Sequence, residues 1–212
     1  MKGTLQFWRA ALAALALGTA FGAAAQANPD ALEQARAAFE RGLRGSESDN
    51  EAASARFQQL SQAEPGNPLY LAYYGSTFTL KARDAWLPWK KLKLGEQGLD
   101  LIDKALKRLT PEQAQAPLGI ETRLVALSTF LKTPDQFFHR YDSGKALLDE
   151  IMKNPAFAHY PPRIQARFHA QAAGVARKEG KPAEEAAQLK RVLELDPQGG
   201  DAARARLKEL GA

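Results

Sequence analysis

The segment EGKPAEEAAQLKRVLELDP, residues 179–197, has the pattern of a turn, an amphipathic helix and a stop. Gly180 suits the turn, Leu189 and Val192 share one helix face, and Pro197 ends the helix because its ring cannot continue one. The remaining positions are mostly Ala, Glu, Gln, Lys and Arg, which favour helix. A helix of this kind cannot bury its apolar stripe alone, so the segment predicts stacking against neighbouring helices.

The rest of the chain has the same helical character. It is rich in Ala, Leu, Glu, Gln, Lys and Arg, and no stretch shows sustained period-two alternation of β-branched residues. Amphipathic runs are followed, at intervals of 46, 44 and 42 residues, by Pro65, Pro111, Pro155 and Pro197. Each interval has room for a pair of helices and additional turns. The sequence therefore predicts an all-α fold of stacked antiparallel helical hairpins.

Local signals place the helix ends. Helices are expected to begin at Asn28-Pro29, Asn67-Pro68, Pro88, Pro117 and Pro161-Pro162. Capping boxes are expected at Ser48–Glu51 and Thr110–Gln113. The helix from Pro88 should be the longest. A last helix, Asp201–Leu210, is charged on most faces and is expected to be the polar capping helix that closes a helical array at its C-terminal end.

The last helical pair resembles a tetratricopeptide repeat (TPR). The resemblance is carried by Gly180 between the helices, and by Leu189, Val192, Leu193, Leu195 and Pro197. A second match comprises Ala53, Phe57 and Pro65, followed by Tyr74, Gly75 and Phe78. The units are longer than the family period of about 34 residues, and Glu185 occupies a position where the family prefers Ala.

The resemblance implies a single TPR-like α-solenoid domain over residues 28–212. It also implies a concave surface that binds a peptide or a partner helix, and no catalytic site. An unrelated helical bundle is the alternative.

The first 27 residues have the layout of a secretory signal peptide. Lys2 and Arg9 are followed by the uncharged apolar run Ala10–Gly22, and Ala25-Gln-Ala27 is a signal peptidase motif. We expect cleavage after Ala27 and a periplasmic protein with no stable membrane anchor. An uncleaved N-terminal anchor is the alternative, although the apolar run is short for a membrane span.

Composition bounds the function further. The chain of 212 residues has no cysteine, so neither disulfides nor thiolate chemistry is available. Without Lys2 and Arg9 the net charge falls from +5 to +3, which by itself does not imply nucleic acid as a partner. His139, His159 and His169 form no metal-binding motif, and we expect no metal and no other cofactor.

The sequence departs from the TPR pattern between Phe78 and Gly98, where about 11 extra residues are present. This insertion contains Trp86 and Trp89, and the charge around them is strongly positive, with the candidate ligand-binding lysines Lys90 and Lys93. Aromatic and cationic side chains together can hold an anionic or amphiphilic ligand, or form an interface hot spot. Alternatively, both tryptophans bridge a wide corner into the core while the lysines stay solvated.

A second group of candidates precedes the insertion on a single predicted helix. Tyr73, Ser76, Thr79 and Arg83 could line a concave groove of the kind in which helical repeats bind peptides. A purely structural role for these side chains is the alternative.

These observations favour a non-enzymatic scaffold that binds an unidentified envelope protein or peptide, as an accessory to an assembly or transport system. The alternative function is a periplasmic binding protein for an anionic or amphiphilic small molecule at the Trp86–Lys93 insertion.

Overall fold

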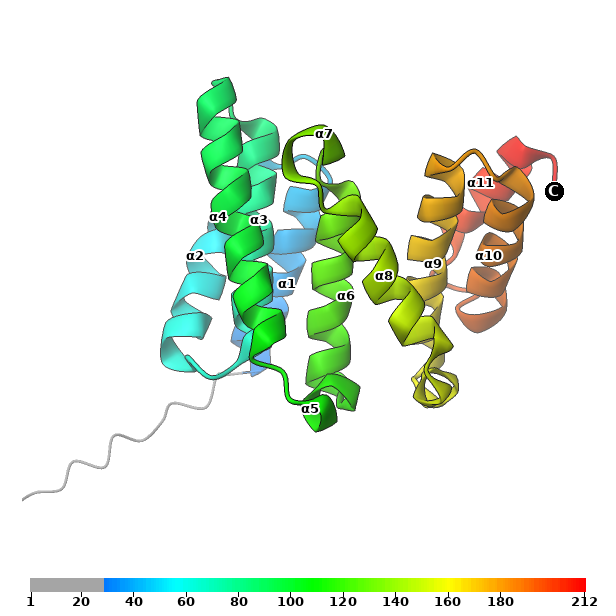
Figure 1. Ribbon diagram of the computed structural model, residues 1–212, viewed down its shortest axis with the longest axis horizontal. Helices are drawn as coiled ribbons and strands as arrows, with labels where there is room; N and C mark the ends of the chain where they lie inside the picture. Colours follow the sequence, from blue (N-terminus) through cyan, green and yellow to red (C-terminus); the bar gives the residue numbers. More distant parts are fainter. Residues whose placement is uncertain (1–28) are drawn as a thin grey trace, which may run out of the picture.

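The computed structural model describes residues 29–212, so the predicted signal peptide and its cleavage site lie outside the described residues. The described chain forms helices without any β-strand (Figure 1), which confirms the all-α prediction. The helices are α1 (Pro29–Leu43), α2 (Glu47–Ala63), α3 (Pro68–Asp84), α4 (Pro88–Lys107), α5 (Pro111–Gln115), α6 (Pro117–Lys132), α7 (Asp135–Phe138), α8 (Tyr141–Lys153), the 3-10 helix η1 (Pro155–His159), α9 (Pro162–Lys178), α10 (Pro182–Leu195) and α11 (Asp201–Leu210).

Most of the predicted helix starts are confirmed. Asn67 caps α3 by accepting a hydrogen bond from the Leu69 amide, 3.1 Å away. The capping box of α5 is formed by Thr110 and Gln113, and α4 is the longest helix of the described chain, with 20 residues. The prediction of a capping box at Ser48–Glu51 is wrong. Helix α2 begins earlier because Ser46 is the residue whose hydroxyl accepts from the amide three positions on, that of Asp49.

Neighbouring helices along the chain pack against each other in pairs. The pairs are α1 with α2, α3 with α4, α6 with α8, and α9 with α10, and α11 packs on α10. The first helices of these pairs also meet in succession, because α1 contacts α3, α3 contacts α6, and α6 contacts α9. The short helices α5, α7 and η1 lie at the ends of the longer ones (Figure 1).

The apolar core is a series of four clusters that share helices. One joins α1, α2 and α3 and includes Ala105 of α4 and Val125 of α6, and a second joins α4 to α6. A third is built by α6, α8, η1 and α9, and the last by α9, α10 and α11. Because each cluster shares a helix with the next, burial of apolar surface continues from α1 to α11.

The extra residues between Phe78 and Gly98 lengthen two helices. Helix α3 continues to Asp84 and helix α4 begins at Pro88, so only three residues join them. This hairpin extends beyond the ends of the neighbouring helices (Figure 1). Trp86 is 91% exposed and Trp89 is 68% exposed. The interpretation that these tryptophans bridge a wide corner into the core is therefore wrong, since the corner is a tight turn at a projecting end.

Glu185, the departure from the TPR pattern noted above, joins α10 to α11. Its carboxylate is buried and accepts two hydrogen bonds from Arg206, at 2.6 and 3.1 Å. A charged residue is tolerated at this position because its charge is paired and hydrogen-bonded. Within residues 29–212, no helix is both long and apolar enough to cross a membrane.

Candidate functional site: a cationic groove

The described chain contains a groove of about 670 Å³. Its walls come from the first helices of the four pairs, α1, α3, α6 and α9, and from the N-terminal half of α4 and the α7 turn. Apolar side chains from all of these elements except α9 form most of its surface, namely Phe39, Leu43, Leu80, Leu92, Leu124, Val125, Phe137 and Phe138. A concave, mainly apolar surface with a few polar groups is typical of a ligand-binding site.

Tyr73 is held on the floor of the groove by a network that joins three helices. Its ring stacks on Phe57 with a centroid separation of 4.5 Å, and only 4% of the residue is exposed. Its hydroxyl donates a 2.7 Å hydrogen bond to Glu121 of α6, and Arg36 of α1 pairs with the same carboxylate. Burial, together with the charge and hydrogen bond of Glu121, raises the pKa of Tyr73 well above its usual range. Tyr73 is therefore a fixed part of the wall.

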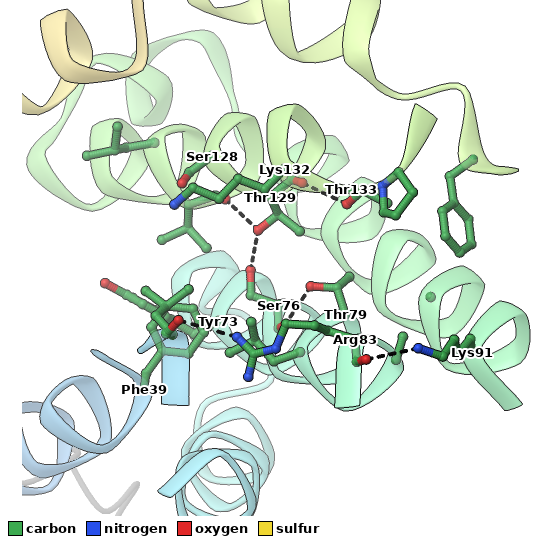
Figure 2. Close-up of a pocket in the computed structure, with 18 of the residues that line it drawn as sticks. Phe39, Tyr73, Ser76, Thr79, Arg83, Lys91, Ser128, Thr129, Lys132 and Thr133 are labelled. Atoms are coloured by element: carbon green, nitrogen blue, oxygen red, sulfur yellow. Dashed lines mark hydrogen bonds between the residues drawn. The ribbon is translucent and has the colours of Figure 1, made fainter. Parts of the chain in front are cut away.

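The hydroxyl groups of Ser76, Thr79 and Thr129 are already bonded to the protein (Figure 2). Ser76 of α3 and Thr129 of α6 share a 2.5 Å hydrogen bond between their hydroxyls across the groove floor. Thr79 donates to the Ser76 carbonyl at 2.8 Å. The bond between Ser76 and Thr129 fixes the spacing of α3 and α6, and Ser76 itself is buried.

Arg83 lies at the groove but its guanidinium is occupied by the protein. It makes two hydrogen bonds to Asp84, at 2.6 and 2.8 Å, and donates to the carbonyl oxygens of Gly42 and Leu43 at the end of α1. The Lys91 ammonium donates a 3.1 Å hydrogen bond to the Arg83 carbonyl (Figure 2). Arg83 thus tethers α1 to α3, and its remaining capacity to bind an anion is small.

Apart from Lys91, whose ammonium is bonded to a backbone carbonyl, two cations of the groove have no acidic partner within the part of the chain that the structure describes. They are Lys132, at the C-terminal end of α6, and Arg167 of α9. Figure 2 shows the Lys132 side chain extended along α6 toward Ser128. Loss of water around its ammonium lowers the pKa of Lys132, and the positive charge of Arg167 lowers it further. An anion bound between these two side chains would relieve this repulsion.

The eight residues expected from the sequence to form the site fall into two groups. Tyr73, Ser76, Thr79 and Arg83 line the groove together. Trp86, Trp89, Lys90 and Lys93 do not line it. Lys90 borders a separate, smaller hollow of about 220 Å³ beside Glu47, Glu51 and Asp84, and the two tryptophans point into solvent.

Sequence reasoning missed the cations contributed by α6 and α9. The available signal was the pair Ser128-Thr129, which interrupts the apolar run of residues 124–131 four and three residues before Lys132. Residues four apart share a helix face, so this polar face could have been followed to Lys132. No local signal marks Arg167, because its place in the groove depends on how α9 packs against α6.

Across the described residues there is no group of three histidine, aspartate or glutamate side chains placed to hold a metal ion. His169 is buried and hydrogen-bonded to Gln188, 2.7 Å away. No protein-family model, no curated protein and no solved structure matches the chain.

Proposed function

We propose that residues 28–212 form a TPR-like array of four helical hairpins, closed by α11, which acts as a non-catalytic binding scaffold in the periplasm. The pairing of α1 with α2, α3 with α4, α6 with α8 and α9 with α10 supports this architecture, as does the succession of contacts between α1, α3, α6 and α9. In such an array the first helices of the hairpins form the concave side, and these helices line the groove.

The proposed occupant of the groove is an extended peptide or a partner helix with apolar and acidic side chains. The observation that carries this proposal is the pairing of an apolar lining with two unneutralised cations, Lys132 and Arg167. The apolar side chains would supply the burial, and the cations would select an acidic group and fix its position.

Site-specific photo-crosslinking tests the proposal. A photoreactive residue in place of Gln171, inside the groove, should capture a partner from an envelope extract, whereas the same residue in place of the exposed Gln58 on α2 should not. The captured segment would then be synthesised and its affinity measured. Lys132→Glu/Arg167→Glu should weaken binding at least about tenfold, because both reversed charges would repel an acidic group. Equal capture at both positions, or unchanged affinity of the double variant, would contradict the proposal.

A second candidate occupant is an amphiphilic small molecule with an anionic group. The volume of about 670 Å³ favours it, since small-molecule sites usually occupy a few hundred to a thousand Å³. The site proposed for it is the groove, with Lys91 and Lys132 at its edge. Native mass spectrometry of protein purified from the envelope separates the candidates. A retained small mass that is lost from Lys132→Glu/Arg167→Glu supports the amphiphile, and a ligand-free protein that binds the crosslinked peptide supports the scaffold.

Export is part of the same proposal and has its own measurement. Mass spectrometry of the protein from a periplasmic fraction should give a chain that begins at Asn28. A chain that retains residues 1–27 would show that the segment is an uncleaved anchor or that the protein is not exported.

A further inference from the structure

Exposed apolar side chains gather at one end of the molecule. Seven large hydrophobic residues of the described chain are exposed, and six of them belong to the end of α1, the α3–α4 tip, and α7. We call these six the apolar end surface: Leu43, Trp86, Leu87, Trp89, Leu92 and Phe137.

The six residues are neighbours in the fold. Leu43, Leu92 and Phe137 line the same groove, and Leu43 is tied by its carbonyl to Arg83, three residues before Trp86. Trp86 and Trp89 stand on the tip that projects beyond the other helices (Figure 1). Soluble proteins rarely expose a contiguous apolar patch of this kind unless the patch contacts something.

The α3–α4 tip, residues 85–95, carries only positive charge. Residues 85–95 contain Lys90, Lys91 and Lys93 and no acidic residue. Within the described chain none of these three lysines makes an ion pair, whereas the nearby Lys81 and Arg83 are paired with Glu51 and Asp84. The tip thus carries three lysines without an ion pair beside two exposed indole rings.

We propose that the apolar end surface docks on an anionic lipid bilayer, with Trp86 and Trp89 entering the headgroup region and the three lysines lying against lipid phosphates. Tryptophan is favoured at the membrane–water interface because its ring is apolar and its N–H is polar. Lysines near an anionic surface each add binding energy and keep their ammonium groups in water.

A lipid surface fits this end better than a protein partner does. Cores of protein interfaces are enriched in arginine and depleted in lysine, and the cations of residues 85–95 are all lysines. The tip also projects beyond the other helices (Figure 1), which lets it enter a soft interface without the rest of the molecule. The docking is reversible and peripheral, and its main contacts come from residues 85–95, of which Trp86, Trp89, Lys90 and Lys93 do not line the groove.

Vesicle binding of the chain that begins at Asn28 tests the proposal directly. Trp86 and Trp89 are its only tryptophans, so its intrinsic fluorescence reports on this surface alone. Vesicles in which a third of the lipid is phosphatidylglycerol should cosediment with the protein and shift its tryptophan emission to shorter wavelength. Vesicles of phosphatidylcholine alone should do so weakly, and high salt should release the protein because it screens the lysines.

Variants give the second arm of the experiment. Lys90→Gln/Lys93→Gln should weaken cosedimentation at least about tenfold, given the typical contribution of a lysine at an anionic surface. Lys190→Gln/Lys208→Gln on α10 and α11 changes the net charge equally and should have little effect. Trp86→Ala/Trp89→Ala should abolish cosedimentation.

No preference for anionic vesicles, or binding without a change in tryptophan emission, would overturn the proposal. Tryptophan-dependent capture of a protein by a chain that ignores vesicles would also overturn it, in favour of a protein interface at the same end.

Discussion

Gly75 of α3 and Gly98 of α4 face each other where the two helices cross. A methyl group on Gly75 would lie 2.6 Å from the Gly98 carbonyl oxygen, and one on Gly98 would lie 2.5 Å from the Gly75 carbonyl oxygen. Both distances are well inside van der Waals contact, and the opposing atom belongs to the backbone. The α3–α4 hairpin, which carries the groove residues of α3 and the projecting tip, therefore depends on two positions without side chains.

Gly75→Ala or Gly98→Ala should destabilise the protein by about 2 kcal/mol or more, because the helices must separate to admit the methyl group. Gly174→Ala is the matched control. Gly174 lies inside α9 with open space around it, and alanine there should stabilise the fold by about 0.5–1 kcal/mol. Urea unfolding followed by circular dichroism measures the stability of all three variants. Equal effects of the three substitutions would contradict the close crossing of α3 and α4.

Glu185→Gln should destabilise the attachment of α11, because it removes the carboxylate that pairs with Arg206 between the two helices and leaves Arg206 only Glu209 of its own helix. Hydrogen bonds from Arg206 lower the pKa of Glu185 in the folded protein. The stabilisation is therefore fully present above pH 4.5, the ordinary pKa of this group, and is lost as pH falls through the lowered folded value. Unfolding curves of the wild type and Glu185→Gln should differ at neutral pH and converge in acid. Glu194→Gln, in an exposed pair with Arg191, should change stability little at any pH.

Tyr73→Phe should cost about 1–2 kcal/mol, because the ring stack on Phe57 remains while Glu121 loses a hydrogen-bond donor. Alkaline pH gives a second readout. The pKa of Tyr73 is raised in the folded protein, so its contribution is present below pH 10, the usual tyrosine value, and is lost as pH rises through the folded value. The stability difference between wild type and Tyr73→Phe should therefore shrink only in strong alkali. A difference that disappears near pH 10 would mean that the hydroxyl is accessible to water.

Trp86→Ala/Trp89→Ala should leave the free energy of unfolding within about 0.5 kcal/mol of the wild type, because both side chains are exposed. In solution without lipid, the tryptophan emission of the chain from Asn28 should resemble that of free indole in water and be quenched freely by acrylamide. Phe57→Ala is the contrasting variant. Its ring is fully buried, so its removal should cost about 3–5 kcal/mol. Tryptophan fluorescence that acrylamide does not quench would contradict the exposure of Trp86 and Trp89 at the projecting tip.

The helix boundaries were largely predictable because they depend on nearest neighbours. Asn67 and Thr110 cap their helices through atoms two or three residues away, and such contacts are encoded locally. Ser46 was missed in favour of Ser48 because both serines offer the same hydroxyl, and only the backbone conformation decides between them.

The site was less predictable because it is built from contacts far apart in sequence. Tyr73, Ser76 and Thr79 could be placed on one helix face by spacing alone. Their partners Glu121 and Thr129 are 48 and 53 residues away from Tyr73 and Ser76. The exposure of Trp86 was also beyond a local argument, because helical spacing describes a core aromatic and a surface aromatic equally well.

The joint between α9 and the preceding helices is the most sparsely packed along the series of hairpins. Helix α9 meets α6 and α8 over a smaller area than it meets α10, although α6, α8 and α9 share one apolar cluster. Lys132 and Arg167 are on opposite sides of this joint. A small rotation there would change the separation of the two cations, and with it the size of the group that fits between them.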